Sequence, residues 1–185
     1  MAIKTFTNEQ LTASDTNTYL ANAGLVYITS QTIGTAVSSV TVSNVFTSTY
    51  DRYMIVMSGS KSSNSAPNLT MTLGGLTAGS YYSNIIWQTA STATVNGNTY
   101  SAVNQWTIGI AGNNEIVLVI DQLNPRSTAG KTGRTQWSSF DGSASTGGTG
   151  TLWSTAGNVC TDFTLAPTSG TLTGGIIRVY GYRQA

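Results

Sequence analysis

Histidine is absent from this chain of 185 residues. Without it, neither a Ser–His–Asp triad nor a Cys–His pair can form within the chain, and the commonest zinc ligand is missing. Only 15 residues are charged, eight basic and seven acidic, and the net charge of +1 gives no general attraction to nucleic acid or to an anionic membrane. We therefore predict no nucleic-acid partner, no metal and no other cofactor.

Cysteine and long apolar runs are equally scarce. Cys160 is the single cysteine, so no disulfide can form within the chain, and its segment NVCTDFTL predicts a small core residue rather than a nucleophile. No apolar run approaches the ~20 residues of a membrane-spanning helix, so we expect no membrane insertion. The first ten residues, MAIKTFTNEQ, lack an apolar signal core, so we expect release by host lysis rather than secretion.

Hydroxyl side chains and glycine dominate what is present. The chain has 31 threonines, 22 serines and 20 glycines, and 39% of its residues are hydrophobic, which is enough to form a core. Threonine favours the half-buried surface of a sheet, while serine and glycine favour turns. This composition indicates an all-β protein whose surface is solvated by hydroxyl groups rather than by ions.

The pattern from Leu25 onward consists of short strands separated by turns. Alternation is clear in RYMIVMSGS (52–60) and LTMTLGGL (69–76), and EIVLVIDQL (115–123) is almost wholly apolar. Nine to eleven such segments recur every 8–15 residues or so without intervening helices, which predicts an antiparallel β-sandwich of jelly-roll-like type. The last of them, GGIIRVYGY (174–182), is expected to lie inside a sheet, because an exposed apolar edge invites aggregation.

Two glycine-containing segments are predicted to interrupt the strands. Asn96-Gly97 is the strongest hairpin-turn dipeptide of the chain, so the surrounding STATVNGNTY is expected to be a loop. The cluster Gly147, Gly148 and Gly150 is expected to form a flexible surface loop, because no Lys-Ser/Thr follows it as in a phosphate-binding loop.

Residues 1–24 differ from the rest and are predicted to form a separate N-terminal segment, followed by the sandwich domain at 25–185. An extended arm would precede a short helix at roughly 13–23, with Thr12 as its N-cap, Asp15 near its N-terminus and Gly24 as its stop. So short a helix must pack against its own sheet or against a neighbouring molecule.

No catalytic constellation emerges, and we predict that the protein is not an enzyme. Asp121 and Asp141, both at the ends of expected strands, are the one carboxylate pair that we considered for glycoside hydrolysis. Nothing in the sequence distinguishes them from solvating charges. The segment FDGSAS contains Asp141-Gly142 but not the spacing of a calcium loop, and is expected to be a turn.

Partner contacts are predicted from three sets of residues. The densest basic run could face an acidic partner, exposed aromatic rings near loops could stack on sugar rings or protein surfaces, and the apolar residues of the N-terminal segment could pack on a neighbour. Trp106 and Trp137 lie inside strand patterns and are expected in the core. The candidate contacts are Arg126, Lys131 and Arg134; Tyr81, Tyr82 and Trp153; and Phe6, Leu11, Tyr19 and Leu20.

Three segments carry a resemblance to a known family. KTFTNEQLTASDTNTYLANAGLVYI at the N-terminus, SVTVSNVFTSTYDRYMIV in the first third and FTLAPTSGTLTGGIIRVYGYR at the C-terminus resemble structural proteins of tailed bacteriophages, especially phages of cyanobacteria. The resemblance implies a virion protein with no catalytic residues.

Among the positions in a virion, capsid cement or decoration fits a small single domain without a fibre shaft. The expected partners are then the major capsid protein and further copies of this chain, with a trimer as the natural oligomer. The alternative is an adhesin of the tail or of a head fibre that binds host surface polysaccharide. Tyr81-Tyr82-Ser83-Asn84 is the sequence feature that supports this alternative.

Overall fold

The computed structural model describes residues 24–76, 78–92, 94–140 and 143–182. Within these ranges the protein is all-β, with thirteen strands and no helix, and every strand pairing is antiparallel. The strands are β1 (Leu25–Thr32), β2 (Val40–Val42), β3 (Arg52–Ser62), β4 (Asn68–Leu73), β5 (Tyr81–Thr89), β6 (Val95–Val103), β7 (Trp106–Ile110), β8 (Glu115–Leu123), β9 (Lys131–Phe140), β10 (Ser145–Ser154), β11 (Phe163–Pro167), β12 (Leu172–Thr173) and β13 (Ile176–Tyr182).

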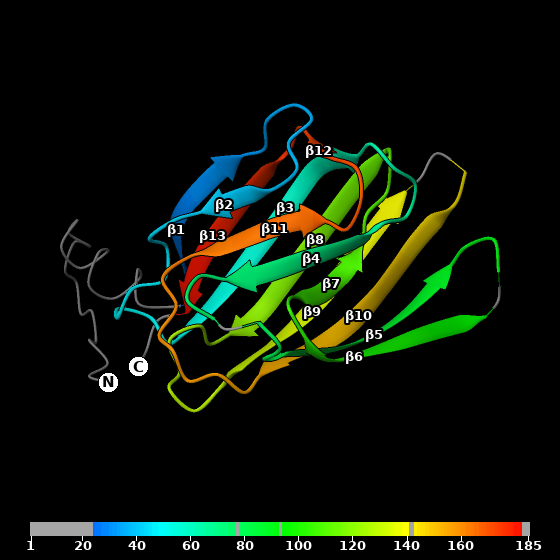
Figure 1. Ribbon diagram of the computed structural model, residues 1–185. Coiled ribbons are helices and arrows are strands. Elements are labelled where there is room, and N and C mark those ends of the chain that lie inside the picture. Colours follow the sequence, from blue (N-terminus) through cyan, green and yellow to red (C-terminus); the bar gives the residue numbers. More distant parts are fainter. Residues whose placement is uncertain (1–23, 77, 93, 141–142, 183–185) are drawn as a thin grey trace, which may run out of the picture.

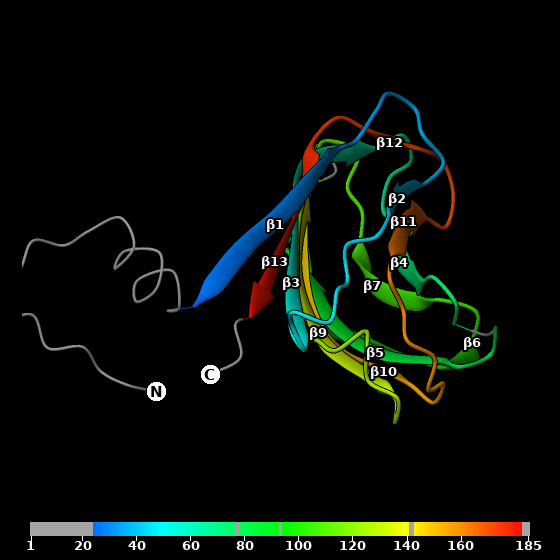
Figure 2. The same ribbon diagram turned by 90° about the vertical axis from the view of Figure 1, so that its left-hand side faces the viewer.

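The strands form two sheets of unequal size (Figure 1). The large sheet has the order β1-β13-β3-β8-β9-β10-β5-β6, with β12 paired to the end of β3, and the small sheet has the order β2-β11-β4-β7. Figure 2 shows the large sheet nearly edge-on, curving so that β5 and β6 pass beneath β7 of the small sheet. The antiparallel, all-β character expected from the sequence is confirmed.

The core lies between the two sheets and follows the period of two along each strand. On β9, buried Lys131, Gly133, Thr135, Trp137 and Ser139 alternate with outward-facing residues. Trp106 and Trp137 are 0% and 5% exposed, as expected from the sequence, and Cys160 is fully buried. The Trp106 indole Nε1 donates a hydrogen bond to the carbonyl oxygen of Trp153 at 2.7 Å, which ties the small sheet to the large one.

The C-terminal strand β13 is an interior strand, as expected. It pairs with β1 on one side and β3 on the other, and Ile177 and Val179 are fully buried. Gly175 precedes it with a φ of 85°, and a Cβ there would lie 2.5 Å from the backbone nitrogen of Ser60. The double glycine therefore permits a close backbone approach that no other residue allows.

The glycine-containing parts of both loops expected from the sequence lie in strands. Asn96 and Gly97 lie within β6, opposite Trp87 and Ile86 of β5, so the connection falls before Val95. A two-residue turn signal is overridden here by a ladder of backbone pairs along the whole hairpin.

The glycine cluster at 147–150 lies within β10, which is paired on both sides, to β9 and to β5. Gly148 is opposite Trp137, and a Cβ at Gly148 would lie 2.7 Å from two atoms of the Trp137 ring. Glycine is thus present at this position to accommodate the indole, not to confer flexibility.

The expected arm, the helix at 13–23 and the contacts Phe6, Leu11, Tyr19 and Leu20 lie outside the described residues. Among the described residues the first strand begins at Leu25.

Candidate functional site

The outer face of the large sheet, the side turned away from the small sheet, collects most of the exposed apolar surface. Of the eight large hydrophobic side chains that the described residues expose, seven lie on strands of the large sheet: Leu25, Tyr27, Ile86, Val95, Val117, Phe140 and Trp153. The small sheet instead presents hydroxyl groups, among them Thr41 and Thr164, whose Oγ1 atoms are 2.8 Å apart. The two sides of the molecule therefore differ in chemistry.

Cross-strand pairing arranges the outer face in rows. One row, which we call the polar row, crosses five strands from β6 to β8 and consists of Thr99, Asn84, Thr151, Arg134 and Asp121. Side chains opposite each other on an antiparallel pair lie close enough to act on one ligand. The polar row therefore brings together residues up to 67 positions apart in the sequence, as from Asn84 to Thr151.

Next to the polar row lies a shallow apolar groove of about 580 Å³. Val117 and Val119 form one side and Ile86 and Val95 the other, while Gly147 leaves the floor open. Val95 is 65% exposed, which is unusual for a valine on a paired strand. Contiguous exposed apolar surface of this kind marks an interaction site more often than chance.

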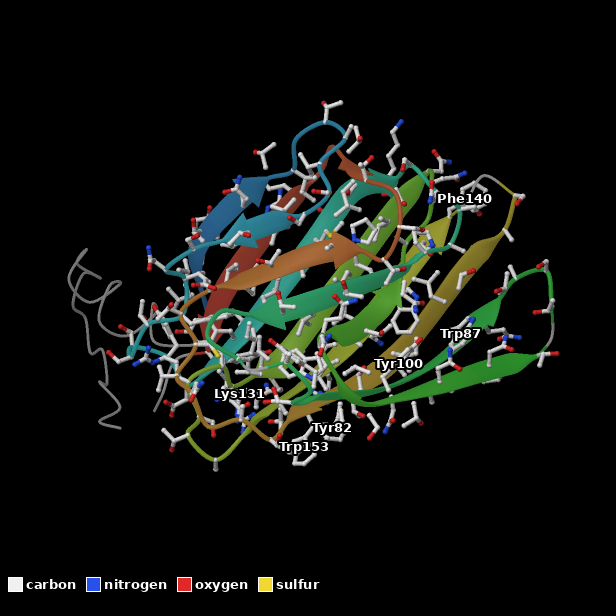
Figure 3. All side chains as sticks on the ribbon, viewed as in Figure 1. Tyr82, Trp87, Tyr100, Lys131, Phe140 and Trp153 are labelled. Carbon is white, nitrogen blue, oxygen red and sulfur yellow. The ribbon has the colours of Figure 1, made fainter. Side chains whose placement is uncertain are left out.

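On the other side of the polar row, Tyr82 and Trp153 form an aromatic pair (Figure 3). The two residues are opposite each other on β5 and β10, and their ring centroids are 4.8 Å apart with an interplanar angle of 51°. They line a hollow of about 280 Å³ together with Asn84, Thr99 and Thr151. Trp153 is 47% exposed, so its ring is available to a ligand.

The charged end of the polar row is neutralised within the protein. Arg134 Nη2 lies 2.8 Å from Asp121 Oδ2, and the Tyr182 hydroxyl donates a hydrogen bond to Asp121 Oδ1. Burial, and secondarily the Asp121 charge, raise the pKa of Tyr182 above its ordinary value. Asp121, Arg134 and Tyr182 line a pocket of about 290 Å³, in which Asp121 is the one carboxylate among the described residues. Asp141, the other carboxylate of the pair considered for glycoside hydrolysis, lies outside the described residues.

One residue of the basic run cannot contact a partner, so the prediction was wrong for Lys131. Lys131 is fully buried, and its Nζ donates hydrogen bonds to the carbonyl oxygens of Ser127 and Ala156 at 2.5 and 3.1 Å. Burial lowers the pKa of this ammonium group. Arg126 donates a hydrogen bond to the carbonyl oxygen of Phe46, and Arg134 forms an ion pair with Asp121 while its side chain stays 65% exposed. Arg126 and Arg134 therefore stay predicted contacts.

Tyr81 is also excluded as a partner contact, because it is 1% exposed. Its hydroxyl accepts a hydrogen bond from the Leu73 amide and donates one to the Leu73 carbonyl oxygen, at 2.9 and 3.2 Å. Tyr81 packs edge-on against Trp106, so it serves the core while its neighbour Tyr82 faces outward. Sequence analysis missed Thr99 and Thr151, because it read β6 as a loop and did not place β10 beside β5.

Cys160 has the core position expected from the sequence. Burial raises the pKa of its thiol to about 11, so the thiolate is scarce at neutral pH. The described residues contain no group of three or more metal-binding side chains, and no helix in this part of the chain is long and apolar enough to cross a membrane.

Comparison of the whole chain with protein-family models, with curated proteins and with solved structures gave no match in any of the three.

Proposed function

We propose that this protein is a non-enzymatic structural component of a tailed-phage virion, a capsid cement or decoration protein that bridges capsid subunits. The observation that carries the proposal is the outer face of the large sheet, where seven exposed hydrophobic side chains gather. A monomer that keeps such a face in water gains free energy when a partner covers it. The proposed partners are the major capsid protein and further copies of this chain, with a trimer as the oligomer.

We also propose that the two sheets form a jelly-roll-like sandwich. The strand order supports this when the hairpins β5–β6 and β9–β10 are set aside. The large sheet then has the order β1-β13-β3-β8 and the small sheet β2-β11-β4-β7, so that successive strands of the chain alternate between the sheets except at β4 and β7, which both belong to the small sheet. Two interlocked Greek keys have this order, and such sandwiches recur among viral capsid proteins and lectins.

The proposed mechanism is mechanical. The large sheet is supported by the core on its inner side, so its outer face can bridge two capsid subunits without rearranging. A contact of about 1,600 Å² is sufficient for stable attachment. The apolar groove at Val117, Val119 and Ile86 supplies the central part of such a contact, and the hydroxyl and amide groups around it supply a polar rim.

Copy number tests the proposal. Quantitative mass spectrometry of purified virions would give the number of these chains per particle against the major capsid protein. Hundreds of copies are expected for a cement protein on the capsid lattice. A few copies would assign the chain to the tail and refute the capsid role, and its absence from the particle would refute a virion role altogether.

A further inference from the structure

We propose that the hollow beside Tyr82 and Trp153 is a carbohydrate site that binds one or two pyranose rings of a neutral polysaccharide. This site is separate from the apolar groove, and the inference does not depend on capsid attachment. The proposal rests on three properties of the hollow: its aromatic walls, its unpaired polar groups and its lack of charge.

The aromatic walls suit the apolar face of a sugar. The Tyr82 and Trp153 rings are inclined by 51° at a centroid distance of 4.8 Å, so they touch at an angle and form adjoining walls of the hollow rather than facing each other across it. Rings of this kind offer a large contact area while their polar atoms stay wet. The volume of the hollow, about 280 Å³, is just below the usual range for ligand pockets, about 300–1,000 Å³, which favours a small ring over a peptide.

Three polar side chains of the hollow are unused within the protein, whereas the Ser83 and Tyr100 hydroxyls accept hydrogen bonds from Thr107 and Asn68. Asn84, Thr99 and Thr151 lie side by side in the polar row, and their side chains make no hydrogen bond with any described residue. An amide offers two donors and an acceptor, and each hydroxyl offers both. Three neighbouring groups of mixed donor and acceptor character match the hydroxyls of a sugar better than they match a purely anionic or cationic ligand.

The lack of charge selects a neutral glycan. No Asp, Glu, Lys or Arg lines the hollow. The nearest charge in the polar row is Arg134, opposite Thr151, and its guanidinium is held by Asp121 at 2.8 Å. An acidic sugar would have to compete with that carboxylate, so electrostatics give it no advantage over a neutral one.

The position of the hollow supports a binding role. All of its outward-facing residues lie on β5, β6 and β10, the last three strands at one edge of the large sheet (Figure 1). Opposite Tyr82, β6 has an irregular register, and Ala102 there has a φ of 52°. A bulge of this kind redirects side chains at binding sites, and the left-handed backbone of a residue with a Cβ stores strain.

The test is titration of the full chain with hexasaccharides of β-1,4-linked glucose, mannose and N-acetylglucosamine, monitored by tryptophan fluorescence and by calorimetry. Trp153 is a suitable reporter, because it is the most exposed of the four tryptophans: Trp106 and Trp137 are buried and Trp87 is half-buried. We expect at least one neutral hexasaccharide to bind with a Kd of about 1 mM or lower, and Trp153→Ala to weaken binding about tenfold or more.

Phe140→Ala is the matched control, since it removes another exposed ring, 39% exposed, from the outer face. Trp153→Ala keeps the backbone oxygen that accepts the Trp106 hydrogen bond, so it should fold. Trp153→Phe provides a second variant, with an intermediate loss expected because it keeps a smaller ring.

Three outcomes would overturn the carbohydrate site: no neutral hexasaccharide binds at about 10 mM, Trp153→Ala binds as tightly as the wild type, or Phe140→Ala loses as much as Trp153→Ala. A glucuronate-containing hexasaccharide bound more tightly than every neutral one would overturn the preference for a neutral glycan. Capsid attachment of the same variants is measured separately. A variant that loses sugar binding but still attaches to capsids, or the reverse, then shows which of the two proposals has failed.

Discussion

Substitution of Gly148 by alanine tests whether the glycine cluster of β10 is a packed strand. The new Cβ would lie 2.7 Å from Cη2 and Cζ2 of Trp137 and would also contact the carbonyl oxygen of Ile86. Neither group can move aside easily, because the indole is 5% exposed and the carbonyl belongs to the neighbouring strand. Overpacking of this kind costs about 1–3 kcal/mol.

The opposing term is the entropy of the unfolded chain. A glycine replaced by alanine without strain stabilises a protein by about 0.4–1 kcal/mol. We therefore expect Gly148→Ala to lower the free energy of unfolding by about 1–2 kcal/mol. In a chain of this length that corresponds to a fall in Tm of about 2–8 °C.

Thermal and urea unfolding would measure the change, with near-ultraviolet circular dichroism as a probe of the Trp137 ring. Gly97→Ala is the matched control: a Cβ there would lie 3.5 Å from the Ile85 carbonyl oxygen and 3.6 Å from Ile86 Cγ2, which are ordinary contacts. We expect this control to be neutral or slightly stabilised. If Gly148→Ala is as stable as Gly97→Ala, the packing of Trp137 over β10 is wrong.

Three further predictions follow from buried and exposed side chains. The Cys160 thiol, buried and with a pKa of about 11, should react with maleimide at pH 8 about 100-fold more slowly in the native protein than in urea; equal rates would show that the loop around it is open. Burial raises the pKa of Tyr81 above 10.0, so its stabilising effect is present below pH 10 and lost as pH rises through the folded pKa. Tyr81→Phe should lower the free energy of unfolding at pH 7 by about 1–2 kcal/mol, because the Leu73 amide loses its hydrogen-bond partner. Between pH 9 and 12 the variant should lose less stability than the wild type. Urea midpoints measured across that range check both statements, and a parallel fall of the two proteins would contradict the role of Tyr81. Val95→Asp, at a 65% exposed position, should change the free energy of unfolding by no more than about 0.5 kcal/mol while reducing co-sedimentation with capsids; undiminished occupancy would remove the apolar groove from the proposed interface.

The strands that bury one face could be predicted from the sequence, because burial imposes a period of two. β13 is an example: Ile177 and Val179 alternate with Arg178 and Tyr180, and the structure buries the first pair. β6 could not be predicted in this way. It is an edge strand whose residues are largely exposed on both faces, so no apolar alternation is required, and Asn96-Gly97 then gives a misleading turn signal.

The candidate site depends on pairings between distant segments. Tyr81 and Tyr82 are adjacent on a strand, so the sequence indicates that they face opposite ways, but not which one is buried. Tyr82 meets Trp153 only because β10 pairs with β5 in a particular register, across 71 residues of chain. Lys131 shows the same limit, since its burial depends on carbonyl oxygens supplied by two separate loops.

The outer-face residues add little to the core, which argues that they are present for recognition. Trp153 is half-exposed, and the described core does not depend on its side chain, because Trp106 bonds to its backbone oxygen alone. An exposed indole adds little to folding and increases the risk of aggregation. The outward side chains of β5, β6 and β10 lie on the face turned away from the small sheet, so they can vary without disturbing the core. A tryptophan, a tyrosine and three unpaired polar side chains gathered on this outer face are therefore explained better by a ligand than by the fold.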